Sequence, residues 1–169
     1  MVKIQKFIDT PSQTAGPFLH IGCTPRITGI NTFKSELGLT PFQDISDNEA
    51  INIKGKIYDG NKEPIIDAMI ETWQCDANGN YSSNQGFARI VTDFKTGEYQ
   101  LKTIRPGNKI NTDESLSASY ITFWIVARGM NRPLITRMYF LENDLKNDLI
   151  FQSYNIEDRL ITLIPYTED

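Results

Sequence analysis

The chain carries one histidine, His20, and this single count excludes much of the chemistry that clusters of histidines support. Imidazole is the commonest metal ligand and the usual general base near neutral pH. This chain alone therefore cannot build a histidine-rich zinc or iron centre, and any histidine base must be His20. Two cysteines, Cys23 and Cys75, form neither a CxxC pair nor a zinc-ligand spacing. We expect two buried or half-buried thiols in a reducing cytosol, although one disulfide is possible.

Four arginines lie in or beside apolar stretches, where an arginine has two ordinary roles. It either pairs with a carboxylate of the protein or offers its planar guanidinium group to an anionic ligand. The four residues are Arg89, Arg105, Arg128 and Arg137. For Arg128, the structural alternative is a pair with a nearby acid such as Glu71, and the pattern alone leaves both roles open.

Two further patterns favour plain turns. Residues 76–80 resemble a calcium loop only in part, because no acid occupies the closing position of that loop. Three glycines, Gly16, Gly22 and Gly29, do not form a phosphate loop, because a strand and a helix do not flank them in the required order.

The elements that must position these side chains are short strands. Ile51, Ile53 and Ile57 occupy alternate positions with polar residues between them, which predicts a half-buried strand. Other β-branched or aromatic runs, bounded by Gly, Pro, Asn and Asp, predict further strands. They are residues 65–75, 87–92, 99–104, 120–127 and 134–140.

Three of these strands carry more specific expectations. Segments 87–92 and 99–104 flank Lys95-Thr96-Gly97-Glu98, which predicts a hairpin. Segment 120–127 is apolar on both faces apart from Thr122, which indicates a central strand buried on both sides, in a sandwich or under a partner chain. Segment 134–140 is expected to pair with it.

Short strands with little helix predict an all-β fold, an antiparallel β-sandwich. We expect one domain over residues 1–169, with an N-terminal arm and connection over 1–50 and the core over 51–169. Within the first part, residues 10–17 are expected to form an extended arm and residues 24–50 an irregular connection. Residues 155–164 are the place for a short helix.

Composition narrows the class of function. Of 169 residues, 40% are hydrophobic and 22% are charged, with a net charge of −4, which suits a folded domain and disfavours nucleic acid and anionic membranes as partners. The longest nearly apolar run, residues 120–127, is too short to span a bilayer. The first residues have no apolar core of a secretion signal, so we expect a cytoplasmic protein.

Several segments occur in the order in which one enzyme family has them. They are TPSQTAGPFLHIG at 10–22, GKIYDG at 55–60, ETWQCDANGNY at 71–81, GFAR at 86–89, TIRPG at 103–107, ITFWIVARG at 121–129 and TRMYF at 136–140. The set closely resembles the intradiol aromatic-ring-cleaving dioxygenases, and within them the α subunits of protocatechuate 3,4-dioxygenases. The resemblance covers residues 9 to about 165, and its β-sandwich fold agrees with the strand pattern.

The resemblance implies a reaction that inserts both atoms of O2 between the hydroxyl-bearing carbons of a catechol, converting protocatechuate to 3-carboxy-cis,cis-muconate. In the metal-bearing members, two tyrosines and two histidines hold a non-haem Fe(III), which suits hard anionic oxygen ligands. This chain departs from that ligand set. Tyr120 and Thr122 stand where those members have His-x-His, the loop between Tyr81 and Gly86 is short, and residues 108–109 are Asn-Lys where another ligand tyrosine would lie. We expect this chain to bind no iron and a partner β subunit to hold the Fe(III).

The role implied for an α subunit is to complete the active site of the iron-bearing β subunit. The resemblance places Thr14, Gly16, Pro17 and Arg128 around the ring and carboxylate of the substrate, and it assigns no catalytic residue to this chain, so the isolated chain is expected to be inactive. An arginine offers a charge-assisted fork to a carboxylate, a threonine hydroxyl can donate, and a Gly-Pro turn lets the backbone approach a flat ring.

Two alternatives differ in class from a dioxygenase subunit. One is a stand-alone β-sandwich module that binds small aromatic acids without catalysis. The other is an active single-chain dioxygenase, which the missing metal ligands disfavour. A neighbouring reading frame that encodes His-x-His and two ligand tyrosines would favour the two-subunit enzyme.

Overall fold

The computed structural model describes residues 10–11, 13–32, 34, 38–110, 116–140, 148, 153 and 165. Within them lie one short α-helix, one 3-10 helix and eight strands. These are α1 (Leu19–Cys23), η1 (Pro25–Thr28), β1 (Ala50–Lys56), β2 (Met69–Trp73), β3 (Phe87–Val91), β4 (Glu98–Ile104), β5 (Lys109–Ile110), β6 (Leu116–Ser117), β7 (Tyr120–Val126) and β8 (Leu134–Tyr139). In this part of the chain, no helix is long and apolar enough to cross a membrane.

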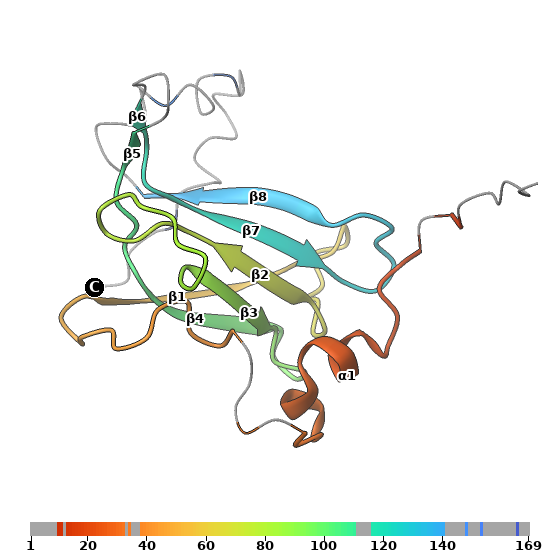
Figure 1. Ribbon diagram of the computed structural model, residues 1–169. Helices are drawn as coiled ribbons and strands as arrows, with labels where there is room; N and C mark the ends of the chain where they lie inside the picture. Colours follow the sequence, from red (N-terminus) through yellow and green to blue (C-terminus); the bar gives the residue numbers. More distant parts are fainter. Residues whose placement is uncertain are drawn as a thin grey trace, which may run out of the picture.

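The strands form two antiparallel layers, which confirms the predicted β-sandwich. One layer is a four-stranded sheet in the order β3-β2-β7-β8, and the other is the ribbon of β1 and β4. Figure 1 shows the ribbon lying behind the larger sheet, with the pair β5–β6 at one end and α1 near the other end, where β7 finishes.

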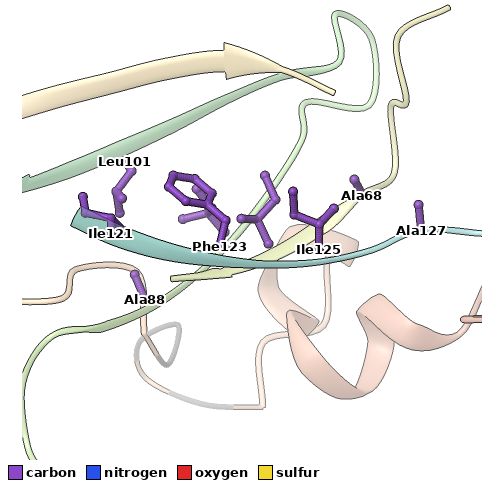
Figure 2. Close-up of a cluster of buried hydrophobic side chains, with 9 residues drawn as sticks. Ala68, Ala88, Leu101, Ile121, Phe123, Ile125 and Ala127 are labelled. Atoms are coloured by element: carbon purple, nitrogen blue, oxygen red, sulfur yellow. The ribbon is translucent and has the colours of Figure 1, made fainter. Parts of the chain in front are cut away.

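The hydrophobic core lies between the two layers. Because side chains alternate along a strand, Ile121, Phe123 and Ile125 of β7 all point to one side and are buried. Figure 2 shows them facing Leu101 of β4, which is 1% exposed. Burial of one such side chain contributes about 1.5–3 kcal/mol, so this cluster fixes the position of β7 and of the turn that follows it.

The predicted hairpin between residues 87–92 and 99–104 is wrong, although both strands exist. β3 pairs with β2 and β4 pairs with β1, so the connection passes from one layer to the other. The physical reason is that Ala88 and Ile90 on β3 face Leu101 on β4 across the core. Side chains that face each other across the core come from opposite layers, so β3 and β4 are not neighbours in one sheet.

The central position of this strand is confirmed, and its burial under a partner chain stays a prediction. β7 lies between β2 and β8, and β8 pairs with it as expected. Its core side is buried, whereas Tyr120, Thr122 and Trp124 on the other side are only half-buried. The apolar character of this strand therefore reflects one core face and one aromatic outer face.

The N-terminal part of the chain carries α1, and η1 lies within the stretch expected to be irregular. Residues 13–16 have no regular structure, and α1 begins after a turn in which the Leu19 N–H donates to the Gly16 carbonyl at 3.1 Å. The helix has only five residues, too few to leave a periodic pattern, and it was not predicted there. The helix that was predicted over 155–164 lies outside the described residues.

Candidate functional site

A hydrogen bond joins the N-terminal arm to the turn between β7 and β8. The hydroxyl oxygen of Thr14 accepts the Gly129 N–H at 2.7 Å, across 115 positions of sequence. Gly129 has a φ of 87°, a conformation that glycine adopts without steric cost. This bond places the Ala15–Pro17 segment beside Arg128, where Figure 1 shows the arm passing the end of β7.

A pocket of about 220 Å³ opens where the arm, α1 and the segment after β7 meet. Three of the four residues predicted for the substrate pocket, Gly16, Pro17 and Arg128, lie in its wall. The fourth, Thr14, is not in the wall, and its hydroxyl is engaged by Gly129 and by the carbonyl of Ala15 at 3.3 Å.

Arg128 has an acidic partner, but it is not Glu71. The Nε–H of Arg128 donates to Oδ2 of Asp67, the residue that precedes buried Ala68. Glu71 instead accepts from Nε and Nη2 of Arg89 at 2.8 and 2.6 Å. The structural pairing and the ligand-binding role are thus compatible for Arg128, because one carboxylate occupies only one of its five donors.

His20 also lines the pocket, beside Asp67, and is only 7% exposed. Its Nε2 lies 3.0 Å from the carbonyl oxygen of Asp67, and its Nδ1 lies 3.2 Å from Oγ1 of Thr24. A carbonyl oxygen can only accept, so Nε2 carries the proton. The edge of the ring packs against Phe94, with the ring centroids 5.6 Å apart. The histidine therefore has a structural use at this site.

The outer face of the four-stranded sheet carries the positions that the resemblance matched to metal ligands. Tyr120 and Thr122 both point to this face. The Tyr81 hydroxyl donates to the Tyr120 hydroxyl at 3.2 Å, while Arg137 lies over the Tyr120 ring at 4.0 Å and Lys109 over the Tyr81 ring at 5.2 Å. Burial, followed by the hydrogen bond that Tyr81 donates to Tyr120, raises the pKa of Tyr81 far above its usual range.

This donor set does not fit a ferric ion. Phenolate ligands require loss of the phenol proton, which the raised pKa of Tyr81 opposes, and two cations beside the phenols repel a metal ion. Thr122 supplies a neutral hydroxyl in place of an imidazole. Among the described residues, no three His, Cys, Asp or Glu side chains gather in a way that could hold a metal.

Two residues of the pocket, Asp67 and Phe94, were missed by the sequence analysis. Asp67 could have been identified from the sequence, because it is the one charged residue in the run Ile65 to Ile70. An acid next to a buried strand needs a partner. Nothing in the sequence distinguishes Phe94, since it lies in an ordinary turn after β3.

Comparisons with known proteins identify the family of the chain. The family model described as Dioxygenase matches residues 32–169. The protocatechuate 3,4-dioxygenase alpha chain of Pseudomonas putida is 37% identical over 144 residues, which is 81% of this chain and 72% of the relative. The alpha chain from Burkholderia cepacia is 29% identical, covering 92% and 78% respectively, and the beta chain from that organism is 29% identical, covering 68% and 55%.

Solved structures show the same fold. Catechol 1,2-dioxygenase from Pseudomonas arvilla C-1 superposes with a TM-score of 0.61 at 22% identity, over 77% of this chain and 47% of that one. Hydroxyquinol 1,2-dioxygenase from Pseudomonas putida DLL-E4 gives 0.60 at 20% identity, over 74% and 48%. The chain thus spans about half the length of these two structures. Since the family model covers most of the chain and the fold agrees, the chain belongs to the intradiol dioxygenase family.

Proposed function

We propose that this chain is the iron-free α subunit of a protocatechuate 3,4-dioxygenase-like complex. The complex cleaves protocatechuate with O2 to 3-carboxy-cis,cis-muconate, and a partner β subunit holds the Fe(III). Two relatives named alpha chains match 81% and 92% of this chain, and a relative named beta chain matches 68%. The departures at Tyr120 and Thr122 support placing the iron on the partner.

The observation that carries the proposal is the pocket itself. Gly16 and Pro17 come from the arm and Arg128 from the end of β7, yet they line one wall beside Asp67. The pocket's volume of about 220 Å³ is below the roughly 300–1,000 Å³ of complete ligand sites. A wall contributed by a second chain would complete it.

The chemistry of this chain in that site is binding and orientation. The guanidinium group of Arg128 receives the substrate carboxylate through charge-assisted hydrogen bonds, each worth about 1.5–3 kcal/mol where it is shielded from water. Pro17 and Phe94 offer apolar surface to the ring. Holding the ring in one orientation relative to the partner's metal lowers the entropic cost of the reaction.

We place the complex in the cytoplasm. Cys23 and Cys75 are both free thiols, as the sequence analysis expected. Free thiols suit a reducing compartment.

The deciding experiment is co-expression of this chain with an iron-bearing β chain from the same source. Purification on a tag placed on this chain should recover both chains with iron, and the complex should consume O2 and protocatechuate in equal amounts. The chain purified alone should do neither. Failure to recover a β chain, combined with tight binding of protocatechuate by the chain alone, would favour the non-catalytic binding module instead.

A further inference from the structure

One N–H donor of Arg128 has an acceptor among the described residues, and the others are available to a ligand. Its Nε–H is taken by Asp67, and within the described part of the chain no acceptor engages the four hydrogens on Nη1 and Nη2. The side chain of Arg128 is 62% exposed, whereas that of Asp67 is 19% exposed. The pair therefore has an anchored member and an accessible member.

Asp67 is anchored through its backbone on both sides. Its carbonyl oxygen accepts the Nε2–H of buried His20 at 3.0 Å, and the next N–H, of Ala68, donates to Oγ1 of Thr92 at 2.9 Å. Ala68 and Thr92 are both fully buried. The Asp67 carboxylate thus projects from a well-anchored segment, so the Arg128 guanidinium group that it binds has a defined position.

The geometry of a guanidinium group makes the choice of donor important. Five N–H groups lie in one plane, and a carboxylate can approach the Nε side or the end formed by Nη1 and Nη2. When Asp67 accepts the Nε–H, the guanidinium group has fewer orientations open to it, and the Nη1–Nη2 end stays available to a second carboxylate. That end matches the two oxygens of a benzoate-type group.

We propose that Asp67 is a positioning residue that holds Arg128 by Nε, so that the Nη1–Nη2 end of its guanidinium group selects catechols that bear a ring carboxylate. This inference rests on the proposed function, and it names how this chain makes the site specific. His20 takes part only by fixing the backbone of Asp67.

A different role for Asp67 makes the opposite prediction. If its negative charge mainly neutralised Arg128, it would weaken the attraction for a substrate anion. Removing the charge would then improve the binding of protocatechuate.

Three variants of this chain, each assembled with the iron-bearing β chain, separate the roles. Asp67→Ala removes the acceptor, whereas Asp67→Asn keeps an oxygen that can accept the Nε–H. We expect Asp67→Ala to raise KM for protocatechuate about tenfold, with the KM for catechol nearly unchanged, and Asp67→Asn to have a smaller effect. Glu71→Gln is the matched control, because it weakens the comparable pair with Arg89 away from the pocket and should not alter the ratio of the two KM values.

Two kinetic outcomes would overturn the proposal. A lower KM for protocatechuate in both Asp67 variants would assign Asp67 to neutralisation. Equal losses of kcat/KM for protocatechuate and for catechol, together with a lower Tm, would mean that Asp67 has a purely structural role.

A second readout does not depend on turnover. In the isolated chain labelled with 15N-arginine, the Arg128 Nε–H resonance should be protected from exchange, and Asp67→Ala should abolish that protection while Glu71→Gln leaves it intact. Loss of the proposed dioxygenase function with this protection present would refute the function and keep the Asp67–Arg128 arrangement. An unprotected Nε–H in the wild-type chain would overturn the positioning role itself.

Discussion

Arg128 meets two demands that a lysine could not meet together. It pairs with Asp67 through Nε, it lines the pocket, and its two amino groups have no acceptor among the described residues. A lysine ammonium would keep the charge but lose the planar fork that can serve two carboxylates at once. If the proposed function is correct, Arg128 combines a structural pairing with a substrate-binding role.

We predict that Arg128→Ala in the assembled complex lowers kcat/KM for protocatechuate by about 2–4 kcal/mol, because a charged hydrogen bond is lost and the substrate carboxylate is left uncompensated. Catechol has no carboxylate and should be affected far less. Steady-state kinetics on both substrates, with melting curves, provides the measurement. Equal losses on the two substrates, together with a lower Tm, would remove the carboxylate role.

Gly16 offers a test of a different kind. A Cβ built on it would meet no atom within 4 Å, and its φ is not in the left-handed region. We therefore predict that Gly16→Ala leaves the Tm of the isolated chain unchanged or slightly higher, since alanine reduces the entropy of the unfolded chain. In the complex, the added methyl group should reduce turnover if substrate or partner backbone approaches this point.

The control for Gly16 is Gly60→Ala, at a turn far from the pocket in sequence where a Cβ also meets nothing within 4 Å. It should leave both the Tm and the activity near the wild-type values. Full activity in Gly16→Ala would mean that neither the substrate ring nor the partner comes close to this glycine.

The residues of the site were only partly predictable from the sequence. Gly16, Pro17 and Arg128 belong to segments that resemble one family, so their type and order sufficed. Asp67 and His20 come together at the site through a hydrogen bond between residues 47 positions apart in sequence. No local pattern encodes such a contact, because it forms only when α1 comes to lie beside the segment before β2.

At the scale of elements, the arm has no regular structure over residues 13–16, and few bonds hold it. The bond between Thr14 and Gly129 is exposed, so its net contribution is modest, about 0.5–1.5 kcal/mol. Its effect is local, because it sets where Gly16 and Pro17 lie.

We predict that Thr14→Val, which keeps the shape but removes the acceptor, leaves the core intact and loosens the arm. Hydrogen exchange of the Gly129 amide should become at least several-fold faster, while amides of β7 such as Phe123 keep their protection. Thr28→Val serves as a control, since its hydroxyl donates to the Pro25 carbonyl at 2.7 Å within η1. Unchanged exchange at Gly129 would show that other contacts hold the arm.

The connection between β3 and β4 depends on Asp93. Its Oδ1 accepts the N–H groups of Thr96 at 2.8 Å and Lys95 at 2.9 Å, and these bonds lower the pKa of the Asp93 carboxyl. A carboxyl whose pKa is lower in the folded state stabilises the fold above its unfolded pKa. That stabilisation is lost as the pH falls through the folded value.

Asp93→Asn keeps an accepting oxygen but removes the titrating charge. We therefore predict that the free energy of unfolding of this variant depends less on pH in the acid range. Between about pH 5 and pH 2, the wild-type chain should lose more of its free energy of unfolding than the variant does. Urea unfolding at several pH values measures the difference. Parallel curves for the two proteins would show that Asp93 does not couple this turn to pH.

This turn also explains why the hairpin prediction failed. The Asp93 N–H does donate to the Glu98 carbonyl at 2.8 Å, so the chain begins as a hairpin would. Beyond that bond the strands separate into different layers, because Ala88 and Leu101 must face each other across the core. Local turn signals specify the reversal of the chain, and only the packing of the two layers decides which strands pair.

At the scale of the molecule, the two faces of the larger sheet have different uses. One face builds the core around Phe123, and the other carries Trp73, Thr122 and Trp124 around a shallow hollow of about 270 Å³. The apolar run of β7 predicted burial on both faces. Half-burial of the second face follows because the described chain supplies no second layer there.

The residues on the same outer face are the basis for the prediction that this chain binds no iron. The fold family places ferric iron in its metal-bearing members, but here the phenols of Tyr81 and Tyr120 bond to each other beside Lys109 and Arg137. A phenol whose pKa is raised by burial gives up its proton reluctantly, and the adjacent cations repel a metal ion. Without two tyrosinate ligands, the charge-transfer absorption that colours ferric–tyrosinate proteins cannot arise.

We predict that this chain, purified alone after growth and reconstitution with iron, is colourless and holds well under one iron per chain. The same treatment of the complex with the β chain should give a coloured protein with iron in proportion to the β chain. Metal analysis and visible spectra of both samples make the comparison, and the complex is the control for the loading procedure. A visible band and one tightly held iron in the isolated chain would overturn the assignment of the metal to the partner, and with it the division of labour in which this chain supplies the substrate wall and the other chain the chemistry.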